Sequence, residues 1–204
     1  AGKADIVARF QGGDNAGHTV YHQGQKYVFH VLPSGILRPR VLNVKGGGVV
    51  VNLKKLTDEL RVIGLKPSGF KRRLRISNEA HLILPCHIAM DQAGEARRGK
   101  LKIGTTLRGI GPAYADRAAR LGLRMGDLLD AQNFRAQLKV CLEHKRAMLP
   151  RRLAREVCNL EKNVLETLAL ARPFLEIIAD TGLLLAEAAR RGRRILYEGA
   201  QGTM

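Results

Sequence analysis

The sequence contains few of the residues on which several protein classes depend. It has no tryptophan, and only 4% of its 204 residues are aromatic, so stacking platforms for single-stranded nucleic acids are scarce. Its three cysteines, Cys86, Cys141 and Cys158, are odd in number and not at metal-binding spacing, which we interpret as reduced, structural thiols. It shows no long apolar run and no secretory pattern at its start. These absences favour a cytoplasmic globular protein.

Acidic residues are also scarce. The chain has 35 Lys and Arg against 18 Asp and Glu, a formal net charge of +17. Such a balance can indicate nucleic-acid binding, but the sequence shows no finger, helix-turn-helix or repeat pattern. A pocket for polyanionic nucleotides explains the charge more simply, and nucleic-acid binding stays the minor alternative. The basic clusters lie at residues 71–75, 97–100, 151–152 and 190–194.

The most informative feature that is present is a polar, glycine-rich segment at residues 11–19, Q-G-G-D-N-A-G-H-T. It follows an apolar stretch of strand length at residues 6–10. A strand that runs into glycines, an amide, an imidazole and a hydroxyl lets the backbone approach a ligand closely. An ordinary strand-to-helix turn also favours Gly and Asn, so this segment alone leaves both interpretations open.

Two further loops of the same character favour a binding site. Residues 103–114, I-G-T-T-L-R-G-I-G-P-A-Y, offer backbone donors, two hydroxyls and a guanidinium, which suit a phosphate monoester. Pro112 is expected at the start of a helix. The third loop, Y-E-G-A-Q-G-T at residues 197–203, follows an apolar strand. Three such loops predict one nucleotide-sized pocket at the ends of a sheet.

Alternating strand and helix patterns predict an α/β fold with a mostly parallel sheet flanked by helices. The length permits one large domain over residues 1–204. A turn at Gly24 is expected to pair Val20-Tyr21 with Tyr27-Val28. Strands are predicted at residues 5–10, 26–31, 49–51, 74–77 and 195–197. Helices are predicted at residues 53–62, 87–98, 112–121, 133–148 and 153–191, the last broken near Pro173.

Six motifs in order resemble the adenylosuccinate synthetase family. Beside the segments at 11–19 and 103–114 and E-G-A-Q-G-T at 198–203, they are L-P-S-G-I-L at 32–37, G-x-G-V-V at 46–50 and A-H-L-I-L-P at 80–85. The resemblance covers essentially the whole chain. It implies the family's P-loop-GTPase-like fold, a homodimer, and the GTP-dependent ligation of IMP and L-aspartate to adenylosuccinate in purine biosynthesis, with Mg²⁺ as cofactor.

The resemblance also implies roles for individual positions. His18 matches the family's general acid, a role that suits an imidazole near neutral pH. Gly17 matches the residue whose backbone carbonyl binds Mg²⁺, a hard cation that prefers oxygen. Arg120 matches an arginine that crosses the dimer interface to the partner's IMP, although a solvated helix surface gives the same pattern. IMP contacts are implied at Asn15, Thr19, Thr106 and Gln201, and GTP contacts at Gly17, His18 and Thr19.

Some of the family pattern is altered or missing. Leu107 stands where the family has Gly, Asp14 where it has His or Asn, and Gly47 where it has Asn. If position 107 requires a positive φ, a leucine there costs about 1 kcal/mol or more. The family's G-D-E-G-K-G-K phosphate loop, with its catalytic base, would precede residue 1, and its guanine and aspartate sites would follow residue 204. We therefore expect an internal piece of the enzyme that is inactive alone, or else a non-catalytic nucleotide-binding remnant.

The remaining histidines are not expected to bind metal. His18 and His22 have the helical spacing of a zinc site, but residues 19–21 favour a strand, which would separate the two side chains. His81 and His87 flank an apolar run and are expected to satisfy local hydrogen bonds. The sequence therefore predicts no zinc site.

Overall fold

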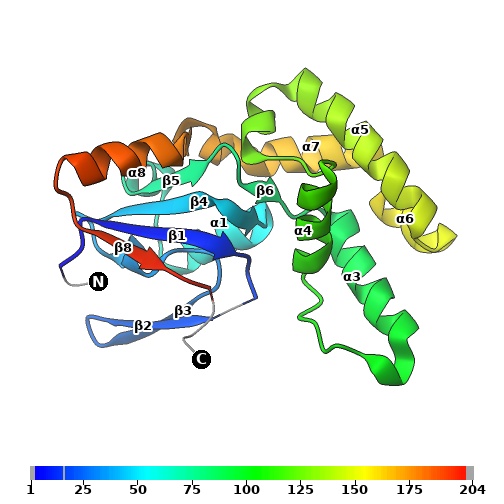
Figure 1. The fold of residues 1–204 in the computed structure, drawn as a ribbon, viewed down its shortest axis with the longest axis horizontal. Coiled ribbons are helices and arrows are strands. Elements are labelled where there is room, and N and C mark those ends of the chain that lie inside the picture. Colours follow the sequence, from blue (N-terminus) through cyan, green and yellow to red (C-terminus); the bar gives the residue numbers. More distant parts are fainter. Residues whose placement is uncertain (1–2, 16, 201–204) are drawn as a thin grey trace.

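A parallel sheet forms the centre of the protein in the computed structural model, which describes residues 3–15 and 17–200. Its strand order is β7-β5-β4-β1-β8, and β6 pairs with the end of β4 (Figure 1). This arrangement confirms the predicted α/β fold. The strands are β1 (Ile6–Gly12), β4 (Leu42–Val51), β5 (Leu74–Ser77), β6 (His81–Leu82), β7 (Ile178–Ala179) and β8 (Ile195–Glu198).

Helices cover the two faces of this sheet. α8 (Thr181–Arg190) packs its Leu184 and Leu185 against Ile6, Ala8 and Val44 on one face. α1 (Leu53–Val62) and α2 (Pro67–Phe70) contribute to the larger core on the other face. Because both faces are covered, the sheet strands carry apolar residues on both sides, as is typical of parallel sheets.

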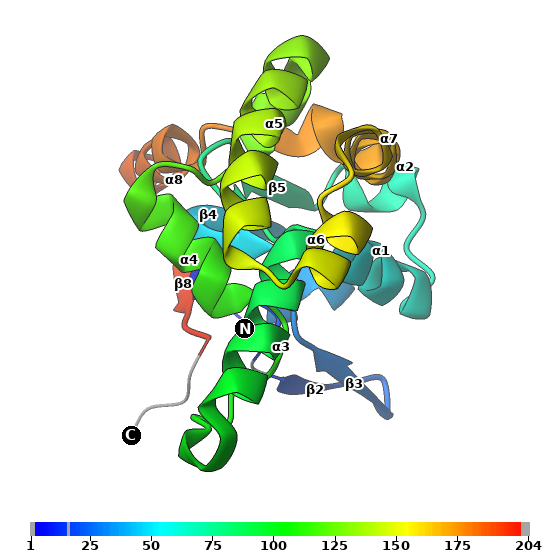
Figure 2. The ribbon, with the colours of Figure 1, turned by 90° about the vertical axis from the view of Figure 1, so that its right-hand side faces the viewer.

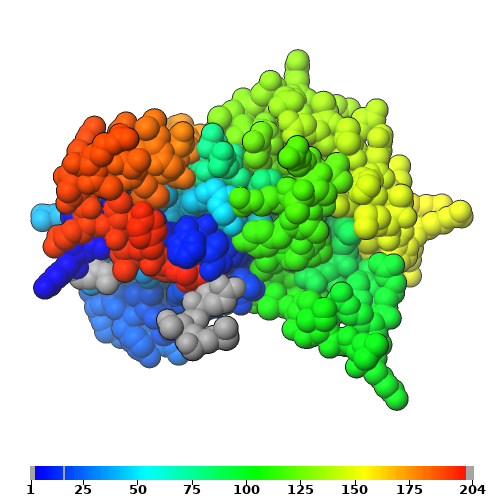
Figure 3. Space-filling view, in the orientation of Figure 1, coloured from blue at the N-terminus to red at the C-terminus, as the bar shows by residue number. Residues whose placement is uncertain are grey.

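Five more helices extend the fold beyond the sheet. α3, α4, α5 and α6 gather on the side toward which β1 and β8 point (Figure 1), and Figure 2 shows α5 and α3 crossing this region. Their surface forms the green and yellow half of Figure 3. Core residues of α3, α5, α6 and α7 belong to the same buried cluster as those of β4 and β5. The bounds are α3 (Pro85–Arg98), α4 (Ile110–Ala119), α5 (Ala131–Met148), α6 (Arg151–Val157) and α7 (Leu160–Ala171).

A small antiparallel hairpin carries the end of the first polar segment. β2 (His18–His22) pairs with β3 (Gln25–Phe29), with Val20 opposite Tyr27. Gly24 has φ +77° in the turn, which confirms the predicted turn. His18 and His22 lie at the two ends of β2, so they do not form a helical pair. Short 3₁₀ helices occur at Ser34–Leu37, Gly99–Leu101, Met125–Leu129 and Arg172–Ile177.

The prediction for residues 153–191 is wrong. Instead of one broken helix, the structure has α6, α7 and α8, with β7 between the last two. Asn159 and Asp180 begin new helices, because their side chains accept hydrogen bonds from Lys162 N and Leu183 N. β7 forms because it pairs with β5, a strand far away in sequence. Local periodicity does not reveal such a partner.

β4 is longer than the predicted strand at 49–51 because it includes three consecutive glycines. The register between β1 and β4 shifts between Arg9 and Gln11. A Cβ on Gly48 would lie 2.3 Å from the Phe10 carbonyl oxygen, so the close approach of the strands requires glycine there. Glycine-rich sequence is typical of loops, but pairing with β1 keeps this stretch within a strand here. No helix among the described residues is long and apolar enough to cross a membrane.

Candidate functional site

The first polar loop begins where β1 ends. Gly12, the last residue of β1, has φ +87°, a conformation that glycine adopts without strain. A Cβ on Gly12 would lie 2.3 Å from the Ala200 Cβ. The first loop therefore touches the third loop directly, and only glycine permits this approach.

The second loop reaches the first through two side chains. Arg108 donates a hydrogen bond from Nη1 to the Asp14 carbonyl oxygen. Tyr114, on α4, accepts a hydrogen bond from Gly12 N at 2.8 Å and donates one to the Gly48 carbonyl at 2.8 Å. These contacts bring together the three loops that the sequence predicts to share one pocket.

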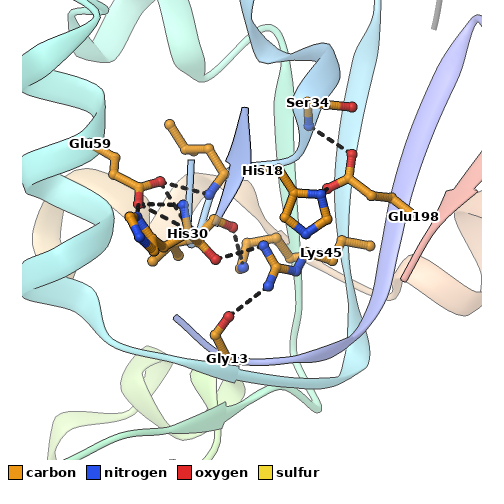
Figure 4. Close-up of polar contacts among 10 residues, drawn as sticks. Gly13, His18, His30, Ser34, Lys45, Glu59 and Glu198 are labelled. Carbon is orange, nitrogen blue, oxygen red and sulfur yellow. Dashed lines mark hydrogen bonds and ion pairs between the residues drawn. The ribbon is translucent and has the colours of Figure 1, made fainter. Parts of the chain in front are cut away.

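His18 lies beside a buried carboxylate from the third loop. Its Nδ1 is 4.0 Å from Glu198 Oε1, while Ser34 N donates to Glu198 Oε2 at 2.9 Å (Figure 4). Among the described residues, His18 Nε2 and Glu198 Oε1 are buried without a hydrogen-bond partner. Unpartnered buried polar atoms are rare in folded proteins and are frequent at functional sites.

A buried arginine holds the first loop through hydrogen bonds. Arg9, on β1, is fully buried and donates to the carbonyl oxygens of His30 at 2.6 Å and Gly13 at 2.7 Å. Burial lowers the pKa of Arg9, and the negative charge of Glu198 partly opposes this effect. Sequence reasoning missed this residue, although an arginine inside an apolar strand was a signal for it.

Two further buried charged residues, Lys45 and Glu59, lie near Arg9 and Glu198 (Figure 4). Lys45, on β4, is fully buried and donates from Nζ to the Val31 carbonyl at 2.7 Å. Burial, and then the nearby Arg9 charge, lowers the pKa of Lys45 to about 7. Glu59 accepts hydrogen bonds from the N–H groups of His30 at 2.7 Å, Val31 and Leu32. Glu59 thereby fixes the irregular segment, residues 30–32, that follows the hairpin.

Asp14 is buried in the first loop. Asp14 is 3% exposed, and its Oδ1 has no hydrogen-bond partner among the described residues. Burial raises the pKa of Asp14, and the Arg108 charge partly opposes this effect. Desolvation of this kind favours the neutral form of a carboxyl group.

The second loop is strained where the sequence predicts strain. Leu107 has φ +56°, so this position does require the left-handed region, and a leucine there costs about 1–2 kcal/mol. Thr106 is exposed beside it. Thr105 instead donates its hydroxyl to Asp91 Oδ1 at 2.8 Å. The two threonines therefore have different surroundings.

Comparison with known proteins decides the family. The description of the matching family is adenylosuccinate synthetase, and the match spans residues 1–204. The chain belongs to the adenylosuccinate synthetase family. It is 45% identical over 201 residues to the adenylosuccinate synthetase of Listeria welshimeri and 44% identical over 205 residues to that of Shouchella clausii. The two matches cover 98% and 99% of this chain but only 46% and 47% of the two relatives.

Solved structures give the same result for the fold. The fully ligated adenylosuccinate synthetase of Plasmodium falciparum matches with a TM-score of 0.86 at 31% identity, covering 98% of this chain and 46% of that chain. Succinoaminodeoxyadenylate synthetase of cyanophage S-2L, solved with dGMP and dATP, matches with a TM-score of 0.55 at 18% identity, over 97% of this chain and 43% of that chain. The second likeness concerns the fold alone. The chain thus spans about half the length of its relatives.

The positions implied by the family resemblance fall into two places in the structure. Asn15, Gly17, His18 and Thr19 share the first loop and the start of β2, and all except the half-buried His18 are exposed. Thr106 lies on the second loop. Arg120 is separate, at the end of α4, where it has φ +58°. It lines a cavity of about 480 Å³ with Arg117 and Arg124. Gln201 lies outside the described residues.

A second polar cluster, which sequence reasoning missed, is buried between α3, α4 and α5. Donor atoms of Cys86, His87 and Cys141 lie within 4.8 Å of one another. His87 Nδ1 accepts from Leu84 N at 3.0 Å, and Nε2 is 2.9 Å from Asp116 Oδ2. Both ring nitrogens of His87 are therefore engaged, as expected for a structural histidine. All three cysteines are free and buried.

Proposed function

We propose that this chain provides the IMP-binding side of an adenylosuccinate synthetase, which joins IMP and L-aspartate with GTP as co-substrate. One observation carries the proposal. His18 Nε2 and Glu198 Oε1 are buried and unpartnered among the described residues, at the point where the loops meet. A ligand with donor and acceptor groups would satisfy both atoms.

In this proposal His18 is the general acid. The reaction develops negative charge on the six-position oxygen of IMP, and a fixed proton donor stabilises such charge. Nδ1 of His18 lies 4.0 Å from Glu198 Oε1, so Nε2 is left to face the substrate. Arg9 holds the loop through the Gly13 carbonyl, which reduces the ordering needed when the ligand binds.

The exposed polar groups around His18 would hold the substrates. We assign the IMP phosphate to the Thr106 hydroxyl, and further IMP contacts to Asn15, Thr19 and Gln201. Contacts with GTP are assigned to Gly17, His18 and Thr19. Thr106 carries a hydroxyl that is exposed on the second loop, as a phosphate ligand must be.

The site offers the type of ligand atom that Mg²⁺ prefers, but fewer such atoms than its coordination shell needs. The exposed Gly17 offers a hard carbonyl oxygen, and bound Mg²⁺ would supply charge neutralisation at the transferred phosphoryl group. One carbonyl is a small part of an octahedral shell, so substrate oxygens and water must provide the rest. The chain's own part is to place that carbonyl next to His18.

The proposal also includes an assembly. Arg120 lies away from His18 at the exposed end of α4, which supports a role toward the IMP site of a second copy in a homodimer. We further propose that residues 1–204 form a single partial domain of a cytoplasmic enzyme.

Calorimetric titration of the chain with IMP and with inosine tests IMP recognition. Thr106→Val is expected to weaken IMP binding by about tenfold to a hundredfold, because a hydrogen bond to a charged group contributes about 1.5–3 kcal/mol. The same change should leave inosine, which lacks the phosphate, unaffected. Thr57→Val, on α1, is the matched control. Equal affinity of the unmodified chain for IMP and inosine would refute phosphate recognition.

A non-catalytic nucleotide-binding protein is the second candidate, favoured by Leu107 at φ +56°. We expect the chain alone to form no adenylosuccinate from IMP, GTP and aspartate, as measured by chromatography of the reaction mixture. Product formation by the purified chain would exclude this second candidate.

A further inference from the structure

Two carboxylates one helical turn apart on α3 hold the second loop. Asp91 and Glu95 are four residues apart, so both project from the same side of the helix. Opposite them runs the segment of residues 103–109 that connects α3 to α4. Each carboxylate accepts more than one hydrogen bond from this segment.

Glu95 binds the beginning of the segment. Its Oε1 accepts from Ile103 N at 3.3 Å and its Oε2 from Gly104 N at 3.0 Å. Arg98 donates to Oε1 at 2.8 Å. Burial by itself raises the pKa of Glu95, but the hydrogen bonds from Gly104 and Arg98 outweigh it and the pKa lies below its ordinary value. Glu95 is therefore ionised at neutral pH, although it is only 5% exposed.

Asp91 binds the middle and the end of the segment. Its Oδ1 accepts from the Thr105 hydroxyl at 2.8 Å, and its Oδ2 accepts from Gly109 N at 3.0 Å. A Cβ on Gly109 would lie 2.6 Å from Ile88 N. The end of the loop is thus pressed against the backbone of α3 at a position that only glycine can occupy.

These contacts divide the loop's donors into two groups. The N–H groups of Ile103, Gly104 and Gly109 and the Thr105 hydroxyl are directed to the carboxylates. They are not the phosphate donors that the sequence suggests. The tip of the loop, residues 106–108, takes no part in these four hydrogen bonds. It carries the exposed Thr106 hydroxyl and the Arg108 guanidinium that reaches the first loop.

We infer that Asp91 and Glu95 are positioning residues that hold the loop tip, residues 106–108, in the shape that receives a phosphate monoester. The inference rests on the proposed function, since it concerns the same phosphate. Fixing both sides of the tip removes ordering that the ligand would otherwise have to impose. Neither carboxylate touches the substrate.

Amide hydrogen exchange and calorimetry of Asp91→Asn and Glu95→Gln test this inference. Glu143→Gln, an exposed acid on α5, is the control for loss of one negative charge. Without ligand, the Gly109 amide in Glu95→Gln and the Gly104 amide in Asp91→Asn should exchange about tenfold faster than in the unmodified chain. Each of these amides keeps its own carboxylate acceptor in that variant, so faster exchange reports loosening of the loop that carries the tip. Far-ultraviolet circular dichroism checks that each variant is folded.

In titrations, both loop variants should bind IMP about tenfold more weakly and inosine equally well. Unchanged exchange of the Gly109 amide in Glu95→Gln and of the Gly104 amide in Asp91→Asn would overturn the positioning role, whatever the IMP affinity. Equal losses for IMP and inosine would overturn it as well, since the loop would then act on the whole site. If the unmodified chain does not prefer IMP to inosine, the proposed function fails, while the exchange measurement still decides how the tip is held.

Discussion

Replacement of Lys45 by methionine is expected to stabilise the protein at neutral pH and to remove part of its pH dependence. Lys45 is fully buried in the central strand β4. It forms no ion pair with any acid in residues 3–15 and 17–200, and its Nζ donates to the Val31 carbonyl. Methionine has a similar length and no charge to bury.

The size of the effect follows from the proton equilibrium. Burial lowers the pKa of Lys45 from 10.5 to about 7. Between these values the unfolded chain binds more protons at this site than the folded chain, so the free energy of unfolding rises with pH. At about 1.4 kcal/mol per pH unit, the whole window is worth about 5 kcal/mol. Below about pH 7 the lysine is charged in both states, and the cost of burying it is fully present.

Urea unfolding from about pH 6 to about pH 10 measures the free energy of unfolding of the unmodified protein and of Lys45→Met. The difference between the two free energies cancels the other titrating groups. Lys45→Met should be more stable by several kcal/mol near pH 6, and its advantage should shrink as pH rises, leaving only the small constant cost of the unpaired Val31 carbonyl. Lys139→Met, at a 63% exposed side chain, should show no such trend. A Lys45→Met difference that stays constant across this pH range would refute the reasoning.

Three further changes test other parts of the structure. Lys145→Met removes the lysine partner of the buried Asp116 and leaves it His87 alone, so it should lower the free energy of unfolding by about 3–5 kcal/mol, measured with urea; a loss below about 1 kcal/mol would show that His87 by itself stabilises the buried carboxylate. Leu107→Gly relieves a φ of +56° and should raise the melting temperature, whereas Leu107→Ala should not. Gly109→Ala introduces a Cβ 2.6 Å from Ile88 N and should destabilise the fold and weaken IMP binding in the calorimeter; unchanged stability would mean that α3 moves to accommodate it.

Much of the candidate site could be predicted because it is local in sequence. The first and second loops combine glycines with polar side chains directly after a strand or before a helix, and this pattern indicates close backbone approach. The strain at Leu107 followed from one substitution within such a loop, and its φ of +56° confirms the prediction. The helix at Leu53–Val62 and the strand at Leu74–Ser77 also match their predicted bounds.

Other parts of the site could not be predicted because they depend on distant partners. The charges of Arg9 and Lys45 are tolerated inside the sheet because carbonyl groups of His30 and Val31 accept their hydrogen bonds. Cys141 meets Cys86 only when α5 packs against α3. The sequence marks Arg9 as unusual within an apolar strand, but it does not show which distant groups meet in either arrangement.

By itself, the sequence determined the family, the α/β class and the loops that carry the candidate chemistry, because each depends on residues that are neighbours in the chain. Only the tertiary structure decided which donors remain for a ligand. The amides of Ile103, Gly104 and Gly109 resemble phosphate donors in the sequence, but Asp91 and Glu95 accept their hydrogen bonds. A backbone N–H group usually donates to one acceptor. The packing of the chain decides which acceptor lies beside it.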